Sequence, residues 1–275
     1  MRDGASTIGE QLAALAAQTY PGAFDVVVAD NGSTDDTRAV VESWSERLPR
    51  VVVVDATGRR GAGYARGVGA EAATGDFLAF CDADDVVAPE WLAALAESAR
   101  EHDIVTGVLD ATELNAEAVR RWRPERARSI PRAGFLPFAP SGNFGVWADV
   151  FRATGGFDER YLQNEDVEWS WRAQLASYTL GFAPDAVVHY RYRTGARGIA
   201  REGFGRGLCT VRLYRDFRAR GMRRPPTGRS ARRWLWLVVR APYVLSSDRR
   251  GLWVRRAGES AGRLVGSVRF RVWCP

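Results

Sequence analysis

The sequence contains no lysine and few cysteines. All 39 basic residues are arginine, a bias that genome composition explains as readily as function, so arginine identity alone indicates no mechanism. The three cysteines, Cys81, Cys209 and Cys274, are too few for a disulfide framework and lack the spacing of a metal site. No apolar stretch approaches the roughly 18 residues of a membrane span, and the N-terminus lacks the apolar region of a signal peptide. These absences lead us to expect a cytoplasmic protein.

Charge is distributed unevenly along the 275 residues. Residues 1–190 carry 17 arginines against 29 acidic residues, a net charge of −12, whereas residues 191–275 carry 22 against 4, a net charge of +18. The hydrophobic fraction of 46% excludes wholesale disorder, so the chain is expected to fold around a sizeable core. An acidic body with a basic tail predicts that the tail binds phosphates, either on nucleic acid or on anionic lipid.

Helix and strand patterns alternate through the first two-thirds of the chain. Apolar residues at helical spacing predict helices, and short β-branched runs predict buried strands. The alternation predicts a mostly parallel sheet that helices cover on both faces. A basic loop or short helix is expected within residues 120–132. The predicted helices span residues 6–18, 35–48, 61–73, 89–100, 147–154 and 165–177, and the predicted strands span residues 24–29, 50–55, 76–81, 104–109 and 186–192.

The chain opens on a helix pattern that no strand pattern precedes. The first strand of a doubly wound sheet is central, so the strands at 24–29 and 76–81 would flank a gap of about 10 Å. Unpaired backbone groups on both sides of such a gap are costly. We therefore expect an upstream start that supplies an apolar strand of about six residues. The alternative is that the flanking strands close up and distort the ligand pocket.

Carboxylates directly follow two of the predicted strands. Asp30 occurs in ADNGSTDDT, and Asp82 and Asp84 occur in FCDADD. Ligands of open α/β sheets bind at the carboxyl ends of strands, so both groups lie where a ligand should bind. Alternatively, the first segment is a turn in which Ser33 or Thr34 caps a helix, and the second is a solvated acidic turn. Clustered carboxylates repel one another unless a cation joins them, and hard oxygen ligands suit Mg²⁺ or Mn²⁺.

Four sequence segments occur in the order in which family 2 glycosyltransferases of GT-A fold carry them. They are DNGSTDDT, YARGVGAEAATGDFLAFCDADD, GGFDE and NEDVEWSWR, and the chain resembles this family over about residues 3–193. The opening RDG also resembles the loop after the family's first strand, which agrees with an absent first strand. The resemblance implies a nucleotide-diphospho-sugar donor, a divalent cation (Mn²⁺ or Mg²⁺) and an inverting transfer to a hydroxyl group.

The resemblance also implies roles for residues of the first half. Asp30 looks like the carboxylate that reads the nucleotide base, and Asn31 and Ser33 belong to the same donor-binding turn. Arg66 stands in ARG where the family often has ARN, and is a candidate nucleotide contact. Gly67 stands where the family often has the asparagine of ARN, so the pocket lacks the side-chain amide of that residue.

Two acidic pairs carry the implied chemistry. Asp82 and Asp84 match the DXD motif, in which Asp82 would face the ribose or the donor sugar and both acids would belong to the metal site. Asp166, paired with Glu165, matches the catalytic base that takes the proton of the acceptor hydroxyl. Alternatively, Glu165 and Asp166 only complement the dipole of a helix N-terminus.

His189, Arg191 and Arg193 alternate along a predicted strand end, so their side chains are expected to share one face. They would clamp the diphosphate, with His189 as a third metal ligand, or they would form an ordinary strand edge. Trp169 and Trp171 lie on opposite faces of their predicted helix. Trp169 would stack on an acceptor sugar or, as is commoner, pack in the core.

The basic tail combines apolar and arginine-rich segments. Residues 234–245, WLWLVVRAPYVL, are too short and interrupted to span a membrane, and residues 257–272 keep a helical apolar face beside arginines. This pattern favours helices that lie in a membrane interface, although VRFRV at 268–272 also alternates like a strand. The alternatives are a helical subdomain packed on the body, or nucleic-acid binding, for which no motif is present. We therefore predict that residues 229–273 contact an anionic membrane surface and that nucleic acid is not a partner.

Together these patterns predict an α/β protein of GT-A fold with a basic helical extension. Residues 1–110 would bind the nucleotide sugar, residues 111–193 would bind the acceptor, and residues 194–275 would form the tail. We expect transfer to a lipid-linked or cell-envelope glycan at the inner face of the cell membrane. The alternatives are a glycosyltransferase of soluble natural products and a catalytically impaired binding protein. A nucleotidyltransferase would be expected to carry a glycine-rich loop with lysine, and the chain has no lysine.

Overall fold

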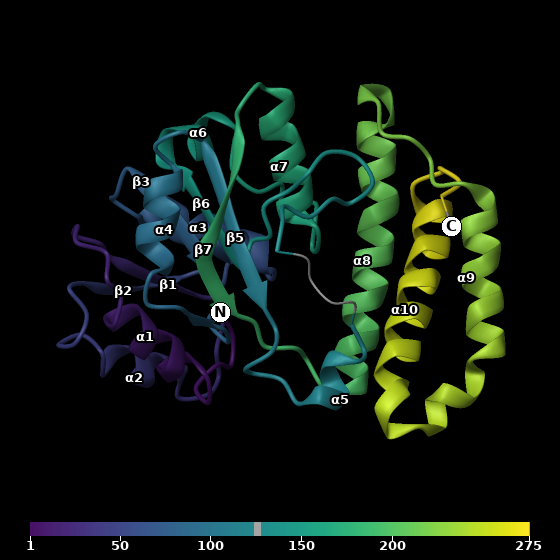
Figure 1. Ribbon diagram of the computed structural model, residues 1–275, viewed down its shortest axis with the longest axis horizontal. Coiled ribbons are helices and arrows are strands. Elements are labelled where there is room, and N and C mark those ends of the chain that lie inside the picture. Colours follow the sequence, from purple (N-terminus) through teal and green to yellow (C-terminus); the bar gives the residue numbers. More distant parts are fainter. Residues whose placement is uncertain (124–127, 275) are drawn as a thin grey trace.

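The computed structural model describes residues 1–123 and 128–274. Residues 124–127, part of the segment in which a basic loop or short helix is expected, lie outside the described residues. An α/β body is followed by a layer of helices beside it (Figure 1). The strands are β1 (Val26–Asp30), β2 (Val51–Asp55), β3 (Phe77–Cys81), β4 (Val86–Val87), β5 (Ile104–Asp110), β6 (Asn143–Trp147) and β7 (Leu180–His189).

Helices connect and cover these strands. The body contains α1 (Ile8–Ala16), α2 (Thr37–Glu42), α3 (Ala62–Ala72), α4 (Trp91–Ser98), α5 (Glu117–Arg120), α6 (Ala148–Ala153) and α7 (Glu165–Leu175). The helical layer contains α8 (Ala196–Phe217), α9 (Thr227–Val239) and α10 (Ser247–Arg269), with 3-10 turns at Arg218–Arg220 and Ala241–Leu245.

The strands form two separate sheets in the described part of the chain. β1 and β2 run parallel, with Val26 opposite Val51. The other sheet has the order β3-β6-β5-β7-β4. In it β5 and β7 are parallel, whereas the β3–β6, β5–β6 and β4–β7 pairs are antiparallel. The α/β prediction is confirmed, but the sheet is mixed, because the unpredicted β6 and the short β4 insert antiparallel strands.

The first residue of the chain lies beside the end of β1. The amino group of Met1 donates to the carbonyl oxygen of Ala29, and the amide of Asn31 donates to the carbonyl oxygen of Met1 at 2.7 Å. Met1 thus forms hydrogen bonds with the residues on either side of Asp30, which is the pattern of two parallel strands. An upstream strand at this position stays a prediction.

Helices cover both faces of the larger sheet, as the alternation predicts. On one face α1 and α4 contribute Leu12 and Leu95, both fully buried, to a core that includes Val105 of β5. On the other face α6 and α7 pack against β3 and β6, where Trp169 is 0% exposed. Trp169 packs against three phenylalanine rings in tilted or edge-to-face contacts and donates its indole N–H to Thr154 Oγ1 at 2.9 Å, so it is a core residue.

The helical layer packs on the body through α8. Trp171, on the opposite face of α7 from Trp169, shares a core with Leu213 and Phe217 of α8. α10 lies along α8 (Figure 1). A Cβ atom at Gly207 would lie 2.1 Å from a carbonyl oxygen of α10, so this backbone contact requires glycine. Packing on the body is therefore confirmed for part of the tail. α10 ends at Arg269, and residues 270–272 form a turn and an irregular segment, so the strand interpretation of residues 268–272 is wrong.

Several predicted boundaries differ from the structure. The helix expected at 35–48 is the short α2, after which the chain continues in turns and bends to Pro49. The strand expected at 186–192 begins six residues earlier, at Leu180, and ends at His189. Among the described residues, none of the helices is both long and apolar enough to span a bilayer.

Candidate active site

The turn after β1 is organised around a buried carboxylate. Asp30 is 1% exposed, and its Oδ1 accepts hydrogen bonds from the amide of Ser33 at 2.9 Å and from Ser33 Oγ at 2.7 Å. Its Oδ2 accepts a hydrogen bond from Arg38 Nε at 2.7 Å. Burial acts to raise the pKa of Asp30, but the bonds from Arg38 and Ser33 outweigh it and lower the pKa. Asp30 is therefore held ionised and shapes the turn.

Asn31 joins this turn to the loop after β2. Its Nδ2 donates to the carbonyl oxygens of Ala56 and, at 2.6 Å, Arg59, and its Oδ1 accepts the amide of Gly61 at 3.2 Å. The predicted donor-binding residues Asp30, Asn31 and Ser33 are thus brought together by hydrogen bonds within the chain. Their contacts with a nucleotide remain a prediction.

A half-buried arginine connects three of the motifs. Arg66 lies on α3, with 15% of its side chain exposed, and forms an ion pair with Asp82 after β3. Its Nη1 donates to Glu165 Oε1, at the start of α7, at 2.8 Å. Burial acts to lower the pKa of Arg66, but the two carboxylates raise it further than burial lowers it, so the guanidinium stays charged. Arg66 therefore brings the ARG, DXD and Glu-Asp segments to one place.

The two acids of the DXD motif carry different partners. Asp82 pairs with Arg66, whereas Asp84 has a raised pKa, because it is partly buried and lies near the negative charge of Asp82. The carbonyl oxygen of Asp84 accepts a hydrogen bond from Arg191 Nε at 2.8 Å. Burial and the repulsion from Asp82 both favour the neutral form of Asp84, and neutralisation of the Asp82 charge would favour its ionised form. A divalent cation would supply this neutralisation, and carboxylate oxygens are suitable ligands for Mn²⁺ or Mg²⁺.

The Glu165-Asp166 pair begins α7, as the motif predicts. Asp166 Oδ2 accepts the amide of Ser141 at 3.0 Å, and its Oδ1 accepts the amide of Val167 at 2.8 Å. Burial, aided by the charge of Asp166, raises the pKa of Glu165 to about 7, although Arg66 acts in the opposite direction. The two neighbours therefore face different groups, since Glu165 contacts Arg66 and Asp166 contacts the loop before β6.

His189, Arg191 and Arg193, which were expected to share one face of a strand, do not lie on one strand in the structure. β7 ends at His189, and Arg191 and Arg193 follow in an irregular segment. Arg191 lies on the acidic loop, where its amide donates to Asp85 Oδ1 at 2.7 Å. The positive charges of Arg193 and Arg191 both favour the ionised form of Asp84. Two of the predicted diphosphate contacts are thus close to the DXD motif.

His189 forms a second candidate cation site with residues that the sequence analysis missed. One possible ligand atom each from His189, Asp110 and Glu113 lies within 4.8 Å of the others. His189 Nδ1 is 3.5 Å from Glu113 Oε2 and, among the described residues, is a buried atom without a hydrogen-bond partner. Asp110 directly follows the predicted strand 104–109. The strand-end rule applied to Asp30 would therefore have found it.

A family model and several known proteins are similar in sequence to this chain. Residues 2–155 match the family model described as Glycosyl transferase family 2. The glycosyltransferase AglE of Haloferax volcanii is 28% identical over 285 residues, which cover 98% of this chain and 88% of AglE. The succinoglycan biosynthesis protein ExoA of Rhizobium meliloti is 27% identical over 209 residues, which cover 70% of this chain and 62% of ExoA.

Solved structures show the same fold. The mannosyltransferase PcManGT from Pyrobaculum calidifontis, in complex with GDP-Man and Mn²⁺, superposes with a TM-score of 0.60 at 21% identity, over 96% of this chain and 73% of PcManGT. Residues 1–349 of S. aureus TarS, in complex with UDP, superpose with a TM-score of 0.55 at 20% identity, over 98% of this chain and 89% of that chain.

Proposed function

This chain belongs to glycosyl transferase family 2 and is a glycosyltransferase, and from this premise we propose an inverting sugar transfer. The donor is a nucleotide-diphospho-sugar, and the acceptor is a hydroxyl group of a lipid-linked or cell-envelope glycan. The observation that carries this proposal is the contact of the half-buried Arg66 with both Asp82 and Glu165. It gathers the implied donor-binding and catalytic motifs at one site. The acceptor class is supported by the name of the relative ExoA, a succinoglycan biosynthesis protein.

The donor site is proposed to begin at the turn after β1. Asp30, Asn31 and Ser33 shape this turn, and Arg66 lies on the helix that packs against β1. In this proposal Asp30 and Arg66 face the nucleotide, and Asp82 faces the ribose or the sugar. Residues 1–110 would then form the nucleotide-sugar half, residues 111–193 the acceptor half, and residues 194–275 the tail. UDP and GDP-Man in the complexes of TarS and PcManGT are examples of such donors in proteins of the same fold.

The diphosphate leaves with negative charge, and the chain offers two ways to offset it. Asp84 and Asp82 would be the ligands of Mn²⁺ or Mg²⁺. His189 would either be a further ligand of this cation or, together with Asp110 and Glu113, form a second cation site. When bound, the cation neutralises the departing diphosphate. Arg191 and Arg193, whose charges act on Asp84, would hold the same diphosphate oxygens from the protein side.

The proton of the acceptor hydroxyl needs one base, because an inverting displacement uses no enzyme nucleophile. We assign this role to Asp166, whose carboxylate is oriented by the amides of Ser141 and Val167. Glu165 positions the pair through Arg66.

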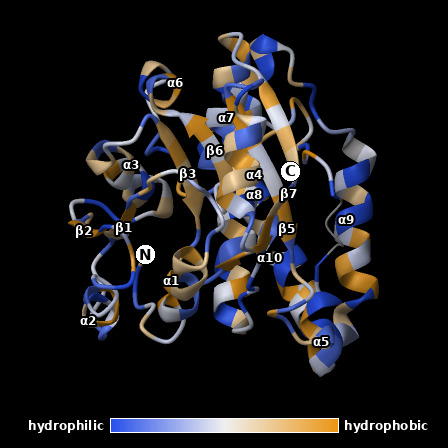
Figure 2. Cartoon of the chain, turned by 60° about the vertical axis from the view of Figure 1, so that its left-hand side comes forward, coloured by the Kyte–Doolittle hydropathy of each residue, from blue (hydrophilic) through white to orange (hydrophobic). Residues whose placement is uncertain are grey.

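The tail is proposed to place the enzyme on the cytoplasmic face of the cell membrane. Hydrophobic and hydrophilic residues alternate along α9 (Figure 2), and several of its apolar side chains are exposed. Leu235, Val238 and Val239 are 63%, 72% and 62% exposed. Such helices bind membrane interfaces. Flotation of the full chain with vesicles of phosphatidylcholine and phosphatidylglycerol tests this proposal. Leu235→Asp should reduce flotation, and equal flotation of the variant would contradict it.

Release of nucleotide from a panel of donors tests the proposed reaction. The full chain is incubated with UDP-glucose, UDP-GlcNAc and GDP-mannose, with Mn²⁺ or after removal of metals. Asp84→Asn should abolish Mn²⁺-dependent release while the fold is retained. Asp185→Asn is the matched control, because Asp185 is exposed on β7 and has no place in the site. Full activity of Asp84→Asn would refute the metal assignment.

A further inference from the structure

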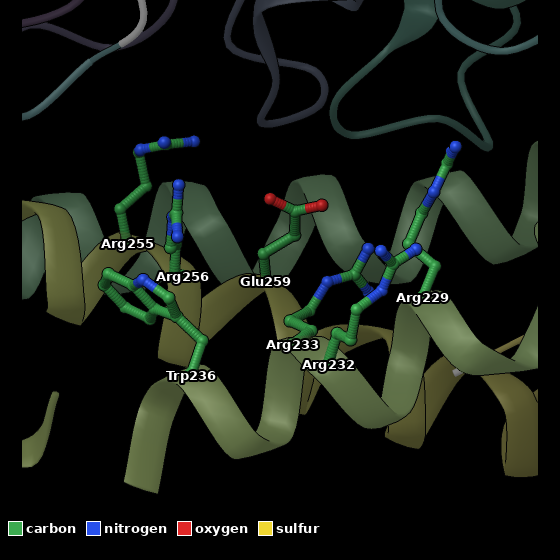
Figure 3. A pocket seen from close by; sticks show the side chains of 7 residues that line it. All are labelled: Arg229, Arg232, Arg233, Trp236, Arg255, Arg256 and Glu259. Atoms are coloured by element: carbon green, nitrogen blue, oxygen red, sulfur yellow. The ribbon is translucent and has the colours of Figure 1, made fainter. Parts of the chain in front are cut away.

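A pocket lies between the last two long helices, on a part of the chain that the proposed sugar transfer does not use. Its volume is about 370 Å³. Figure 3 shows the guanidinium groups from α9 on one side of Glu259 and those of Arg255 and Arg256 on the other. We call it the arginine pocket, and it is lined by Arg229, Arg232, Arg233 and Trp236 of α9 and by Arg255, Arg256 and Glu259 of α10.

The arginine pocket carries a large excess of positive charge. Its described lining contains five guanidinium groups and a single carboxylate, that of Glu259. This carboxylate is shared, because Glu259 Oε1 lies 3.3 Å from Arg263 Nη2 on the same helix. Like charges that converge without a counter-ion repel one another. A folded protein that keeps them together offers a site for an anion.

Two of the guanidinium groups have buried nitrogens that the chain does not satisfy. Arg233 Nη1 and Arg255 Nε are buried and, in the described part of the chain, have no hydrogen-bond partner. Burial, with the nearby charge of Arg263, lowers the pKa of Arg233, and burial with the charges of Arg123 and Arg206 lowers that of Arg255. Buried donors in native proteins nearly always have partners, so these donors indicate an external acceptor.

The arrangement of the arginines selects the chemistry of that acceptor. The guanidinium of Arg256 lies over the indole ring of Trp236, 4.1 Å from its centroid, which limits the plane in which its donors point. Planar guanidinium groups bind phosphate oxygens through paired hydrogen bonds, and several of them favour a ligand with more than one negative charge. A volume of about 370 Å³ is in the range of small-ligand sites.

We propose that the arginine pocket binds a phosphate-bearing anion with two or more negative charges, which is either the headgroup of a lipid or a free diphosphate. The exposed apolar residues Leu235, Val238 and Val239 occur on the same helix as four of the lining residues, which favours the lipid. None of its residues belongs to the glycosyltransferase motifs, so the site goes beyond the proposed sugar transfer, whereas the preference for a lipid rests on the membrane contact proposed for α9.

Titration calorimetry of the full chain with inorganic pyrophosphate in metal-free buffer tests the proposal. Arg232→Gln/Arg233→Gln removes two lining charges and should weaken binding by about tenfold or more, as expected for lost charge-assisted hydrogen bonds. The matched control is Arg249→Gln/Arg250→Gln, which removes the same charge from exposed positions at the start of α10 outside the pocket. The control should bind like the unmodified chain. Equal weakening in both variants, or no binding by the unmodified chain, would overturn the proposal.

Removal of the one acidic group of the pocket gives an independent readout. Glu259→Gln removes the negative charge of the pocket and should tighten pyrophosphate binding, whereas unchanged or weaker binding contradicts the assignment. If circular dichroism shows that the double variant is unfolded, Arg232→Gln alone replaces it, because Arg232 is exposed.

Vesicle flotation distinguishes the two sources of phosphate. Vesicles of phosphatidylcholine with phosphatidic acid should bind the unmodified chain and the control variant. The Arg232→Gln/Arg233→Gln variant should no longer float with them. This result supports a lipid headgroup. Loss of pyrophosphate binding with unchanged flotation supports a free anion. Flotation that falls equally in both double variants reflects net charge and refutes a specific site.

Discussion

Replacing Arg66 by methionine removes the guanidinium that pairs with Asp82 and Glu165 while it keeps most of the apolar stem. The side chain of Arg66 is 15% exposed and that of Glu165 is 8% exposed, so solvent screens the pair weakly. Breaking a buried pair by removing one partner costs about 3–5 kcal/mol, because the carboxylates left without the guanidinium are either desolvated as anions or forced to take up a proton. We therefore expect Arg66→Met to lower the free energy of unfolding by about 3–5 kcal/mol at neutral pH.

The same substitution has a predicted pH dependence. Burial raises the folded-state pKa of Glu165 to about 7 from an ordinary value of 4.5. Between these values the folded chain holds a proton that the unfolded chain has lost, so this group's contribution to stability falls as the pH rises through that window. Arg66 limits the rise, since its charge lowers the pKa. Without Arg66 the pKa rises further and the fall in stability continues above pH 7. Arg66→Met should consequently be more destabilising at pH 8 than at pH 6.

Urea denaturation followed by circular dichroism at both pH values measures this effect. The control is Arg100→Met, which breaks an ion pair whose two side chains are each 74% exposed. Exposed pairs contribute at most about 1 kcal/mol. A loss of less than about 1 kcal/mol in Arg66→Met, or a larger loss at pH 6 than at pH 8, would refute the reasoning.

Three further outcomes test the site and the helical layer. Asp166→Asn should lower kcat by about 10²-fold or more, as for a lost general base, with donor affinity in calorimetry unchanged; a parallel loss of donor affinity would place Asp166 in the donor site. Gly207→Ala brings a Cβ to 2.1 Å from a carbonyl oxygen of α10 and should destabilise the chain by about 1–3 kcal/mol, whereas Gly198→Ala meets nothing within 4 Å and should stabilise it in the same urea assay. Two stable variants would contradict close packing of α8 on α10. Mn²⁺ should raise the unfolding temperature, because it binds the folded chain in preference to the unfolded chain. His189→Ala should reduce this rise more than His102→Ala, which replaces the other histidine. Equal rises in the two variants would show that His189 is not a ligand of the cation.

The sequence predicted most elements of the body because their signals are local. The strands at β1, β2, β3 and β5 were expected within one or two residues, since short β-branched runs between polar turns mark buried strands. β6 was missed because NFGVW is short and lies in a loop-rich segment, and it becomes a strand through pairing with β3 and β5. α2 is shorter than its apolar pattern, because turns replace the helix after Glu42.

The candidate site divides in the same way. Asp30, Asp82 and Asp84 could be placed at strand ends from sequence alone. The grouping of His189 with Asp110 and Glu113 could not, because it depends on the parallel register of β5 and β7, which sets Asp110 opposite His189. Trp169 illustrates the limit of pattern reasoning, since only its neighbours on β6 and α6 make it a core residue.

The sequence by itself determined the family, the order of the acidic motifs and the asymmetry of charge, because each is a property of neighbouring residues or of composition. Tertiary structure decided which of these groups act together. Arg66 and Glu165 are 99 residues apart, and Arg191 and Glu10 are 181 residues apart, yet each pair forms an ion pair. The arginine pocket depends in the same way on the turn that folds α10 back along α9. Contacts of this kind arise when distant segments are buried together, and the free energy of burying a charge depends on every group that surrounds it.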